Sequence, residues 1–432
     1  MDSGAPINLV VTKLTAPTPP AELVGRPRLE QALFDAVSAP TVRVVLISAP
    51  AGSGKSTLVA GWLDRADSCA WLQLDSADRD PARFWGHAVA ALGRAVPDVE
   101  ASVGPAVAQS GADSAPLVET LANALAASGE PAVLVLDDYH LVNNPAIDAA
   151  VEQLIETAPH NFTLVVCTRL DPPLRLSRMR VRGQLAEIRA GDLRFEPDEA
   201  ATLLEHRGAS STRQHVEALC ERTEGWAAGL VLAELSLAGA VDRDAFVEDF
   251  RGDDRLVVDY LTDEFLSQAS QGDRHRYLTT SILDELSGPL VDAVCDCDDG
   301  TAWLQATAAT NQLLIGLDRS RNWFRYHHLL RDMLRLEAHQ VLEVDQLHHR
   351  AGQWHRTNGN LDRAADHLLA AGELRNAADV IADYSMDLLD RGQSDTLDRY
   401  LAQLGRFCGP IRSASLSTCG FTLPADESTM PM

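Results

Sequence analysis

A glycine-rich loop near the amino-terminal end of the chain has the residue types that bind phosphate groups. The segment APAGSGKST (residues 49–57) follows an apolar run and opens a helix-like stretch, with alanine where this loop pattern usually begins with glycine. Gly52 and Gly54 let the backbone curl until its N–H groups point inward, and the helix start adds positive charge there. Lys55 would reach the β- and γ-phosphates of a nucleotide, and the Ser56 hydroxyl would bind Mg²⁺. The predicted site for ATP or ADP comprises Ala49, Pro50, Ala51, Gly52, Ser53, Gly54, Lys55, Ser56 and Thr57.

Charged side chains follow two further strand-like runs. VLVLDDYH (residues 133–140) delivers Asp137 and Asp138 to the carboxyl end of its strand, where parallel sheets bind their ligands. We assign Asp137 to Mg²⁺, directly or through water, and Asp138 to orienting the attacking water of a hydrolysis reaction. Arg169 ends the next run, VVCTR, and would sense the γ-phosphate or stabilise charge that develops during transfer. The structural alternatives are an Asp-Asp helix cap and an ordinary surface arginine.

The charge balance narrows the possible functions. The 432 residues include 62 acidic and 37 basic side chains, and the net charge of −25 argues against a chain that mainly holds nucleic acid. Two of the basic residues, Lys13 and Lys55, are lysines and the rest are arginines, so each lysine is a position to inspect. No apolar run approaches the roughly 18 residues of a membrane span. With no basic leader and seven scattered cysteines, we expect a cytoplasmic protein with free thiols and no membrane contact.

The amino-terminal part alternates between apolar, β-branched runs and helical patterns. Runs that are apolar throughout are typical of strands buried on both faces, and strands that alternate with helices imply a parallel sheet in an α/β domain. The expected strands are 43–48, 69–75, 132–138, 162–168 and, more weakly, 185–190.

The carboxyl-terminal part is mainly helical. Two apolar runs flank the polar turn DRSRN in residues 313–327, which predicts a β-hairpin. A hairpin beside short helices fits a winged-helix module, and the alternative is an isolated surface hairpin. Residues 358–368 and 371–381 resemble one another, and the glycines at 359 and 392 are 33 residues apart. This spacing is close to the ~34-residue period of TPR-type helical pairs.

The expected fold is an α/β P-loop NTPase domain with a parallel sheet, then helical and winged-helix domains and the beginning of an α-helical TPR-like repeat domain. The last segment is poor in charge and rich in Ser, Thr and Pro, so we expect disorder there, from a frameshifted or truncated reading frame. The predicted divisions are an extended lead-in at 1–22, a nucleotide-binding domain at 23–191, a helical domain at 192–270, a winged helix at 271–340, repeats at 341–404 and an off-family tail at 405–432.

Together these residues resemble the STAND class of signalling ATPases, and within it the MalT-like large ATP-binding regulators of the LuxR type. The resemblance covers roughly residues 7–404 and includes LVGRPRLEQAL, TEGWAAGLVLA, SILDELSGPLVDAV, NWFRYHHLLRDML and LHHRAGQWHRTNGNLDRAADHLLAAG. It implies that Val24, Gly25 and Arg26 approach the adenine and ribose. It also implies that His327 reads the bound diphosphate from the winged helix, the alternative being an ordinary histidine between a hairpin and a helix.

The resemblance implies an ATP-dependent switch with slow hydrolysis, self-association and a small-molecule or protein inducer. Members of this family continue to a DNA-binding helix-turn-helix, and no such pattern follows residue 405, which argues against direct DNA binding. The alternatives are a non-catalytic fragment that assembles with full-length paralogues, a DNA-binding transcription factor in its own right, and a ring-forming mechanical ATPase.

Overall fold

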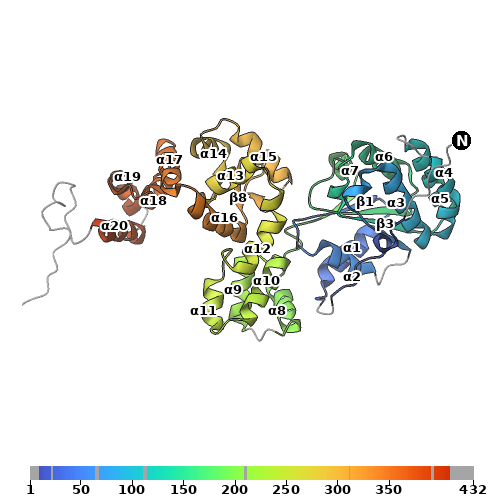
Figure 1. Cartoon of the computed structure of the whole chain (residues 1–432), viewed down its shortest axis with the longest axis horizontal. Helices are drawn as coiled ribbons and strands as arrows, with labels where there is room; N and C mark the ends of the chain where they lie inside the picture. The colour runs from blue at the N-terminus through green and yellow to red at the C-terminus, as the bar shows by residue number, and fades with distance from the viewer. Residues whose placement is uncertain are drawn as a thin grey trace, which may run out of the picture. The chain divides into compact units, whose positions relative to one another are not determined.

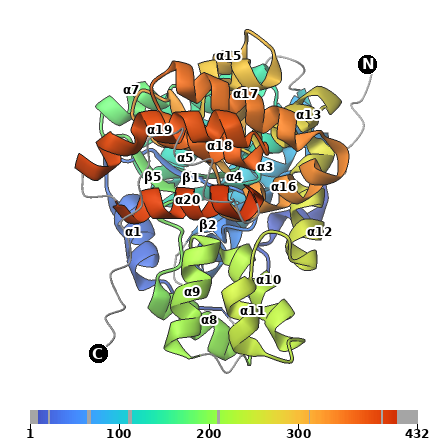
Figure 2. The same ribbon diagram turned by 90° about the vertical axis from the view of Figure 1, so that its left-hand side faces the viewer.

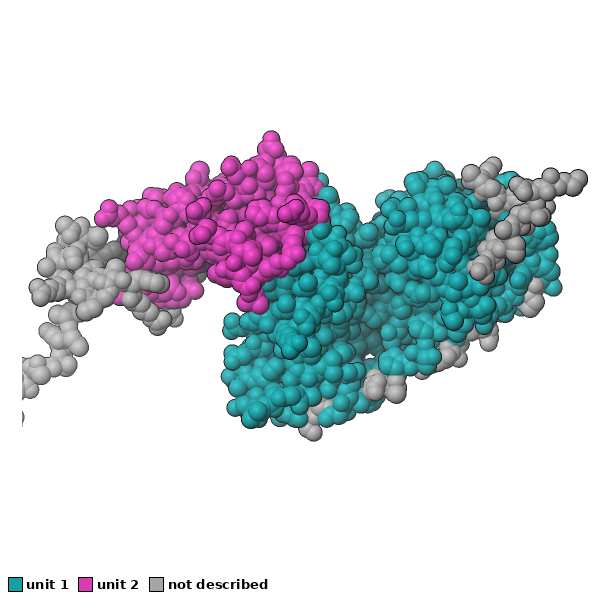
Figure 3. All heavy atoms as spheres, viewed as in Figure 1, with its two compact units in different colours: residues 1–269, 304–333 teal, residues 270–303, 334–432 magenta. Residues whose placement is uncertain are grey.

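The computed structural model describes residues 9–20, 23–63, 68–109, 114–208, 212–310, 312–390 and 394–408. The chain forms two compact units, coloured separately in Figure 3. The first unit comprises residues 1–269 and 304–333, and the second comprises residues 270–303 and 334–432. Among the described helices, none is both long and apolar enough to cross a membrane.

A parallel sheet forms the centre of the first unit, as the sequence predicts. Within the described residues its strand order is β2-β3-β4-β1-β5, so β4 lies between β1 and β3. β1, β3 and β4 are buried at every position, which explains their unbroken apolar runs. The strands are β1 (Val44–Ser48), β2 (Cys69–Gln73), β3 (Ala132–Asp137), β4 (Phe162–Thr168) and β5 (Leu185–Arg189).

Helices cover both faces of this sheet (Figure 1). On one face pack α1 (Pro27–Ser38) and α2 (Lys55–Leu63). The opposite face is covered by α3 (Pro81–Ala95), α4 (Pro97–Gln109), α5 (Ala115–Ser128), α6 (Pro145–Thr157) and α7 (Leu176–Val181). The short helices η2 (Ser76–Arg79) and η3 (Tyr139–Leu141) follow β2 and β3. All five strands run parallel and end at the same edge, where β1 leads into the loop of residues 49–54, β3 ends at Asp137 and β4 is followed by Arg169.

The lead-in is not simply extended, because residues 11–14 form the short helix η1 (Val11–Leu14). Leu14 belongs to the hydrophobic core of the sheet, and the ammonium of Lys13 is buried in ion pairs with Asp75 and Asp78. Burial alone would raise the pKa of Asp78, but hydrogen bonds from His87 and Lys13 hold that pKa well below its ordinary value. Lys13, for which the sequence suggested no role, therefore anchors the amino-terminal segment on the domain.

The rest of the first unit is a helical segment and the predicted hairpin. The helical segment contains α8 (Pro197–His206), α9 (Arg213–Thr223), α10 (Ala227–Ala238), α11 (Arg243–Asp249), α12 (Arg255–Glu264) and η4 (Leu266–Gln268). The hairpin pairs β7 (Leu314–Gly316) antiparallel with β8 (Trp323–Tyr326), which confirms the strand prediction for residues 313–327. The division between units falls inside α15 (Gly300–Thr310) and α16 (His328–Val341).

The second unit is mainly helical and ends in a stack of neighbouring helices (Figure 2). Gly359 and Gly372 have positive φ and terminate successive helices, which explains why the sequence echo carries glycine. The expected tail at 405–432 begins inside a helix, and residues 409–432 lie outside the described residues. The elements are α13 (Gln271–Thr280), β6 (Leu286–Ser287), α14 (Gly288–Cys295), α17 (Val344–Thr357), α18 (Leu361–Ala370), α19 (Leu374–Asp390) and α20 (Ser394–Cys408).

Three histidines pack between α17 and α18. The Nδ1 atoms of His348 and His367 lie 2.8 Å apart, and the ring of His355 stacks on that of His367 at 5.5 Å between centroids. Burial lowers the pKa of His348 and His355 to about 4 and that of His367 to about 3. The folded state therefore favours neutral rings, and acid conditions oppose this packing.

Acidification is expected to destabilise this helix pair. A histidine whose pKa is lowered by folding contributes full stability above its unfolded value near 6.5, and that stability is lost as the pH falls towards 4. The thermal midpoint should fall by about 2–4 °C for each kcal/mol lost between pH 7 and pH 5. His367→Gln should reduce this slope, whereas the matched change at exposed His275 should leave it unaltered; equal slopes in all three proteins would contradict the assignment.

Candidate nucleotide-binding site

The loop between β1 and α2 has the curled backbone that its glycines predict. Gly52 and Gly54 have φ values of +67° and +83°, a left-handed region that glycine enters without strain. Lys55 is the first residue of α2, and its Nζ donates to the carbonyl oxygens of Ala49 and Pro50, both at 2.8 Å. Burial lowers the pKa of Lys55. The ammonium is thus held inside the curl of its own loop.

Asp137 ends β3 beside this loop and is almost completely buried. Burial and the neighbouring charge of Asp138 raise the pKa of Asp137 to about 6, although a hydrogen bond from Ser56 opposes the shift. Among the described residues, no hydrogen-bond donor reaches its Oδ1 atom. A buried carboxylate oxygen without a partner, next to a hydroxyl, is a donor set that suits Mg²⁺. The structure therefore brings together the two predicted metal ligands, and the residues present fit the ion.

Asp138 lies at the rim of the same edge in a left-handed conformation, with φ of +57°. Its Oδ2 accepts a hydrogen bond of 2.8 Å from the side-chain amide of Gln73, the last residue of β2. Its Oδ1 lies 3.9 Å from Nδ1 of His140, whose pKa burial lowers to about 4. The sequence predicted neither Gln73 nor His140 as part of the site, although both stand next to strand ends.

Arg169 directly follows β4. In the sheet β4 lies between β1, which leads into the phosphate loop, and β3, which ends at Asp137. Its positive charge is close enough to contribute to lowering the pKa of Lys55. Its Nη1 atom lies 2.7 Å from Oε2 of Glu264, the last residue of α12. The structure thus places Arg169 near the predicted phosphate site and pairs its charge with a carboxylate from the helical segment.

The helical segment packs directly on the phosphate loop. The indole N–H of Trp226 donates to the carbonyl of Ala51 at 3.0 Å, and the backbone N–H of Ala228 donates to that of Gly52 at 2.9 Å. A Cβ atom at Gly52 would lie 2.5 Å from Cβ of Ala228 and 2.7 Å from the hydroxyl of Tyr260. Gly52 is therefore required both for the left-handed curl and for this close approach.

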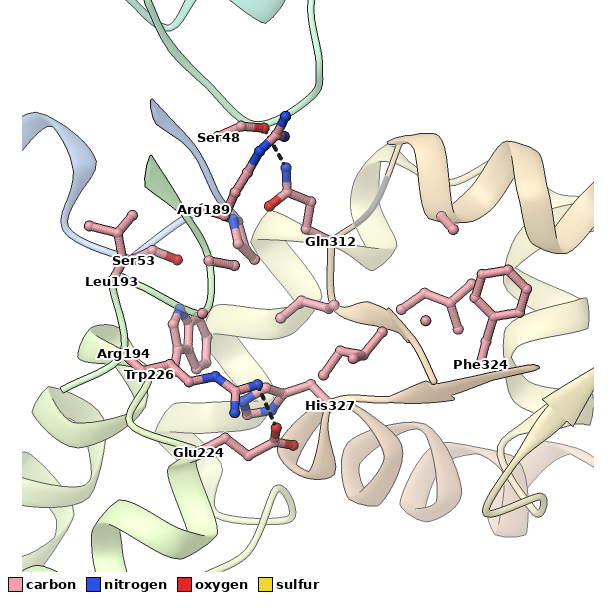
Figure 4. A pocket seen from close by; sticks show the side chains of 18 of the residues that line it. Ser48, Ser53, Arg189, Leu193, Arg194, Glu224, Trp226, Gln312, Phe324 and His327 are labelled. Atoms are coloured by element: carbon pink, nitrogen blue, oxygen red, sulfur yellow. Dashed lines mark hydrogen bonds and ion pairs between the residues drawn. The ribbon is translucent and has the colours of Figure 1, made fainter. Parts of the chain in front are cut away.

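Two cavities open beside the loop. The larger, about 580 Å³, is lined by Pro50 and Ser53 from the loop, by Trp226 from the helical segment and by Phe324 and His327 from the hairpin (Figure 4). The smaller cavity, about 170 Å³, has a mostly apolar surface. Its lining includes Val24, Arg26, Gly54, Thr57 and Phe195. Of the three residues expected near adenine and ribose, Val24 and Arg26 line the smaller cavity and Gly25 does not.

Arg26 also has a structural role that the sequence did not indicate. Its guanidinium donates to the carbonyls of Leu193 and Arg194 at 2.7 and 2.6 Å and pairs with Glu199 at 2.8 Å. It also lies 4.3 Å from the ring centroid of Phe195, a cation–π distance. Arg26 therefore joins the segment before α1 to the entrance of the helical segment.

His327 and Glu224 connect the hairpin to the helical segment. The Nε2 atom of His327 lies 3.1 Å from the carbonyl oxygen of Thr223, and within the described structure its buried Nδ1 has no hydrogen-bond partner. Burial lowers the pKa of His327 to about 4. Glu224 accepts two bonds of 2.7 Å from Arg325 and one of 3.0 Å from Arg194. Burial alone would raise the pKa of Glu224, but Arg325 lowers it to about 2.

Comparisons with known proteins agree with this architecture. The AAA ATPase domain profile matches residues 22–166, and the MalT winged helix domain profile matches residues 262–346. The HTH-type transcriptional regulator MalT of Klebsiella pneumoniae is 31% identical over 402 residues, which cover 92% of this chain and 44% of that protein. The serine/threonine-protein kinase PknK of Mycobacterium tuberculosis is 32% identical over 394 residues, which cover 89% and 35%.

The chain belongs to the MalT-like P-loop ATPases. The Walker-type ATPase PABY2304 of Pyrococcus abyssi shares the fold, with a TM-score of 0.53 and 10% identity over 74% of this chain and 99% of the other. The MalT-like chain spans less than half the length of both MalT and PknK. The family predicted from the sequence is thus confirmed, while the roles of individual site residues stay predictions.

The Glu224–Arg325 pair is expected to hold the hairpin of this MalT-like ATPase against the helical segment. Arg325→Met removes two charged hydrogen bonds from the Glu224 carboxylate, whose side chain is 6% exposed, and leaves it paired with Arg194, so the local cost should be about 1.5–3 kcal/mol. Hydrogen exchange should accelerate in residues 314–327 and 223–226. Arg321→Met, in the exposed hairpin turn, should not have this effect, and unchanged exchange in Arg325→Met would refute the connection.

Proposed function

We propose that this chain is an ATP-binding switch of the STAND class that regulates by changing conformation between its ADP- and ATP-bound states. The observation that supports this most directly is the phosphate loop itself. Its lysine is in place, two of its carbonyls bind the helical segment, and the His327 hairpin borders the same cavity. A loop that touches both the phosphates and the covering segments can transmit the state of the nucleotide.

In this proposal the loop binds the phosphates with the atoms that now form its curl. Backbone N–H groups and the start of α2 would face the phosphate oxygens, and Lys55 would exchange its carbonyl partners for the β- and γ-phosphates. Ser56 and Asp137 would hold Mg²⁺, which supplies charge neutralisation when bound. The smaller cavity offers apolar walls from Val24 and Phe195 for adenine, consistent with a base-sized volume.

Slow hydrolysis would reset the switch. The amide of Gln73 fixes one oxygen of Asp138, which leaves the other oxygen to orient an attacking water. Arg169 would stabilise the charge that develops on the transferred phosphate. In the conformation described here Arg169 is paired with Glu264, which favours low turnover. The same pairing supports the second candidate, a non-catalytic protein that acts by assembling with paralogues.

Self-association in the ATP state and an inducer that acts on the helical repeats complete the proposal. Direct DNA binding is not part of it. Steady-state phosphate release by the isolated chain, with and without a full-length paralogue, distinguishes the two candidates. Phosphate release by the chain alone supports the switch, and release only from the paralogue supports the non-catalytic protein.

Two substitutions are expected to separate binding from turnover. Lys55→Ala removes the buried ammonium and should abolish ATP and ADP binding at micromolar concentrations. Asp138→Asn retains the shape of the side chain and an oxygen for the amide of Gln73, but it loses the carboxylate that would orient the attacking water and accept its proton. Nucleotide binding should therefore persist, while turnover falls by about 10²–10⁴-fold. Fluorescent-nucleotide titration and phosphate release measure the two effects. Unchanged nucleotide affinity in Lys55→Ala would refute the site.

His327 is expected to strengthen diphosphate binding through its charge. Its Nε2–H donates to the carbonyl of Thr223, so Nδ1 carries no proton while the ring is neutral. A diphosphate beside the ring would favour the protonated form, because an adjacent anion stabilises imidazolium. The ADP affinity of the wild type relative to that of His327→Gln should therefore rise as the pH falls from 7.5 to 6, because the two proteins share every other pH effect, including protonation of Asp137 and of the phosphate. An identical pH profile in His327→Gln would contradict the role.

A further inference from the structure

The ion pair between Arg169 and Glu264 lies where the helical segment reaches the edge of the sheet. Nη1 of Arg169 and Oε2 of Glu264 are 2.7 Å apart, and each side chain is about one-third exposed, at 32% and 34%. Arg169 belongs to the sheet domain, whereas Glu264 ends α12 in the helical segment. The pair therefore joins two parts of the first unit through one exchangeable contact.

Glu264 lies on the helix face that covers the phosphate loop. Tyr260 is one helical turn earlier, on the same side of α12, and its hydroxyl would lie 2.7 Å from a Cβ atom at Gly52. Glu264 contacts Arg169 directly and lies four residues after Tyr260 on α12, so the three side chains are neighbours. In agreement with this placement, burial and the charge of Glu264 raise the pKa of Tyr260, whereas the charge of Arg169 lowers it. The charge of Arg169 also acts on Lys55. The Glu264 carboxylate is thus held at the border of the phosphate site.

We propose that Glu264 sets the preference of this site for ADP over ATP, an inference that rests on the proposed function. The carboxylate of Glu264 is paired with the guanidinium of Arg169, the group that the γ-phosphate of ATP would contact in the proposed site. ADP has no γ-phosphate, so it can bind while the pair stays intact. ATP must either break the pair or place its terminal phosphate beside a carboxylate, and both alternatives weaken ATP relative to ADP.

The same competition gives the γ-phosphate a mechanical consequence. When Arg169 turns from Glu264 to the phosphate, α12 loses its ionic contact with the end of β4. The repulsion between phosphate and carboxylate then acts on the helix that presses Tyr260 against Gly52. The difference between ADP and ATP thus becomes a difference in how firmly α12 is held, which is the differential interaction that a population shift requires.

Equilibrium binding of ATP and ADP to the full chain, with Mg²⁺ present, tests this inference. Glu264→Gln keeps the size of the side chain and removes its charge. ATP affinity should rise about two- to fivefold, as expected for a partly exposed charge contact, while ADP affinity should change by less than about 1.5-fold. Asp263→Asn changes the net charge equally at the adjacent exposed residue and should leave both affinities unaltered.

A second variant separates nucleotide selection from simple bracing of α12. In an Arg169→Gln background, Glu264 and the γ-phosphate no longer compete for a guanidinium. Glu264→Gln should therefore change the ATP-to-ADP affinity ratio by less than half as much as it does in the wild type. An unchanged ratio in Glu264→Gln overturns the inference while the wild type still binds both nucleotides. Equal losses of both affinities overturn it in favour of a brace. A wild-type chain that binds neither nucleotide overturns the proposed function as well.

Discussion

The buried ammonium of Lys55 is the constraint on which the rest of the site depends. An unpaired charge removed from water costs several kcal/mol, so the fold must supply oxygen atoms around it. Two carbonyls of its own loop do this directly, and the carboxylates of Asp137 and Asp138 partly offset the effect of burial on its pKa. The loop reaches this geometry because Gly52 and Gly54 accept positive φ. The present partners are neutral carbonyls, which an anionic phosphate oxygen can replace.

The outward side of the same loop gives the proposed switch a physical route from the nucleotide to the rest of the first unit. The carbonyls of Ala51 and Gly52 accept hydrogen bonds from Trp226 and Ala228, so the loop cannot change shape without affecting the helical segment. From there, Thr223 and Glu224 bind the hairpin through His327 and Arg325. The route from phosphate loop to hairpin is therefore a short series of direct contacts, each with a named donor and acceptor. Such a series is a physical link that substitutions can interrupt.

The sequence predicted the parts of this site that depend on strand ends. Apolar runs identify strands, and parallel strands end at one edge, so Lys55, Asp137 and Arg169 are brought together by topology alone. It could not predict Gln73, because a glutamine as the last residue of an ordinary strand carries no distinguishing pattern. Nor could it predict Glu264, one of many acidic residues in an acidic chain, since its importance comes from how α12 packs on the sheet domain. Contacts between segments distant in the chain depend on tertiary packing rather than on local spacing.

The two lysines show how a compositional signal becomes a physical one. Both ammonium groups are buried in the fold, Lys55 among loop carbonyls and Lys13 against Asp75 and Asp78. A compact ammonium with three donors fits such enclosed oxygen sites, whereas a planar guanidinium needs a wider, flatter space. Lysine persists at two positions of this arginine-rich chain, and at both the enclosed space favours the smaller ammonium. Lys55 belongs to the proposed nucleotide site, whereas Lys13 does not. The composition thus indicated two positions at which the space around the side chain is restricted. Only the groups around each ammonium distinguish a phosphate-binding lysine from a structural one.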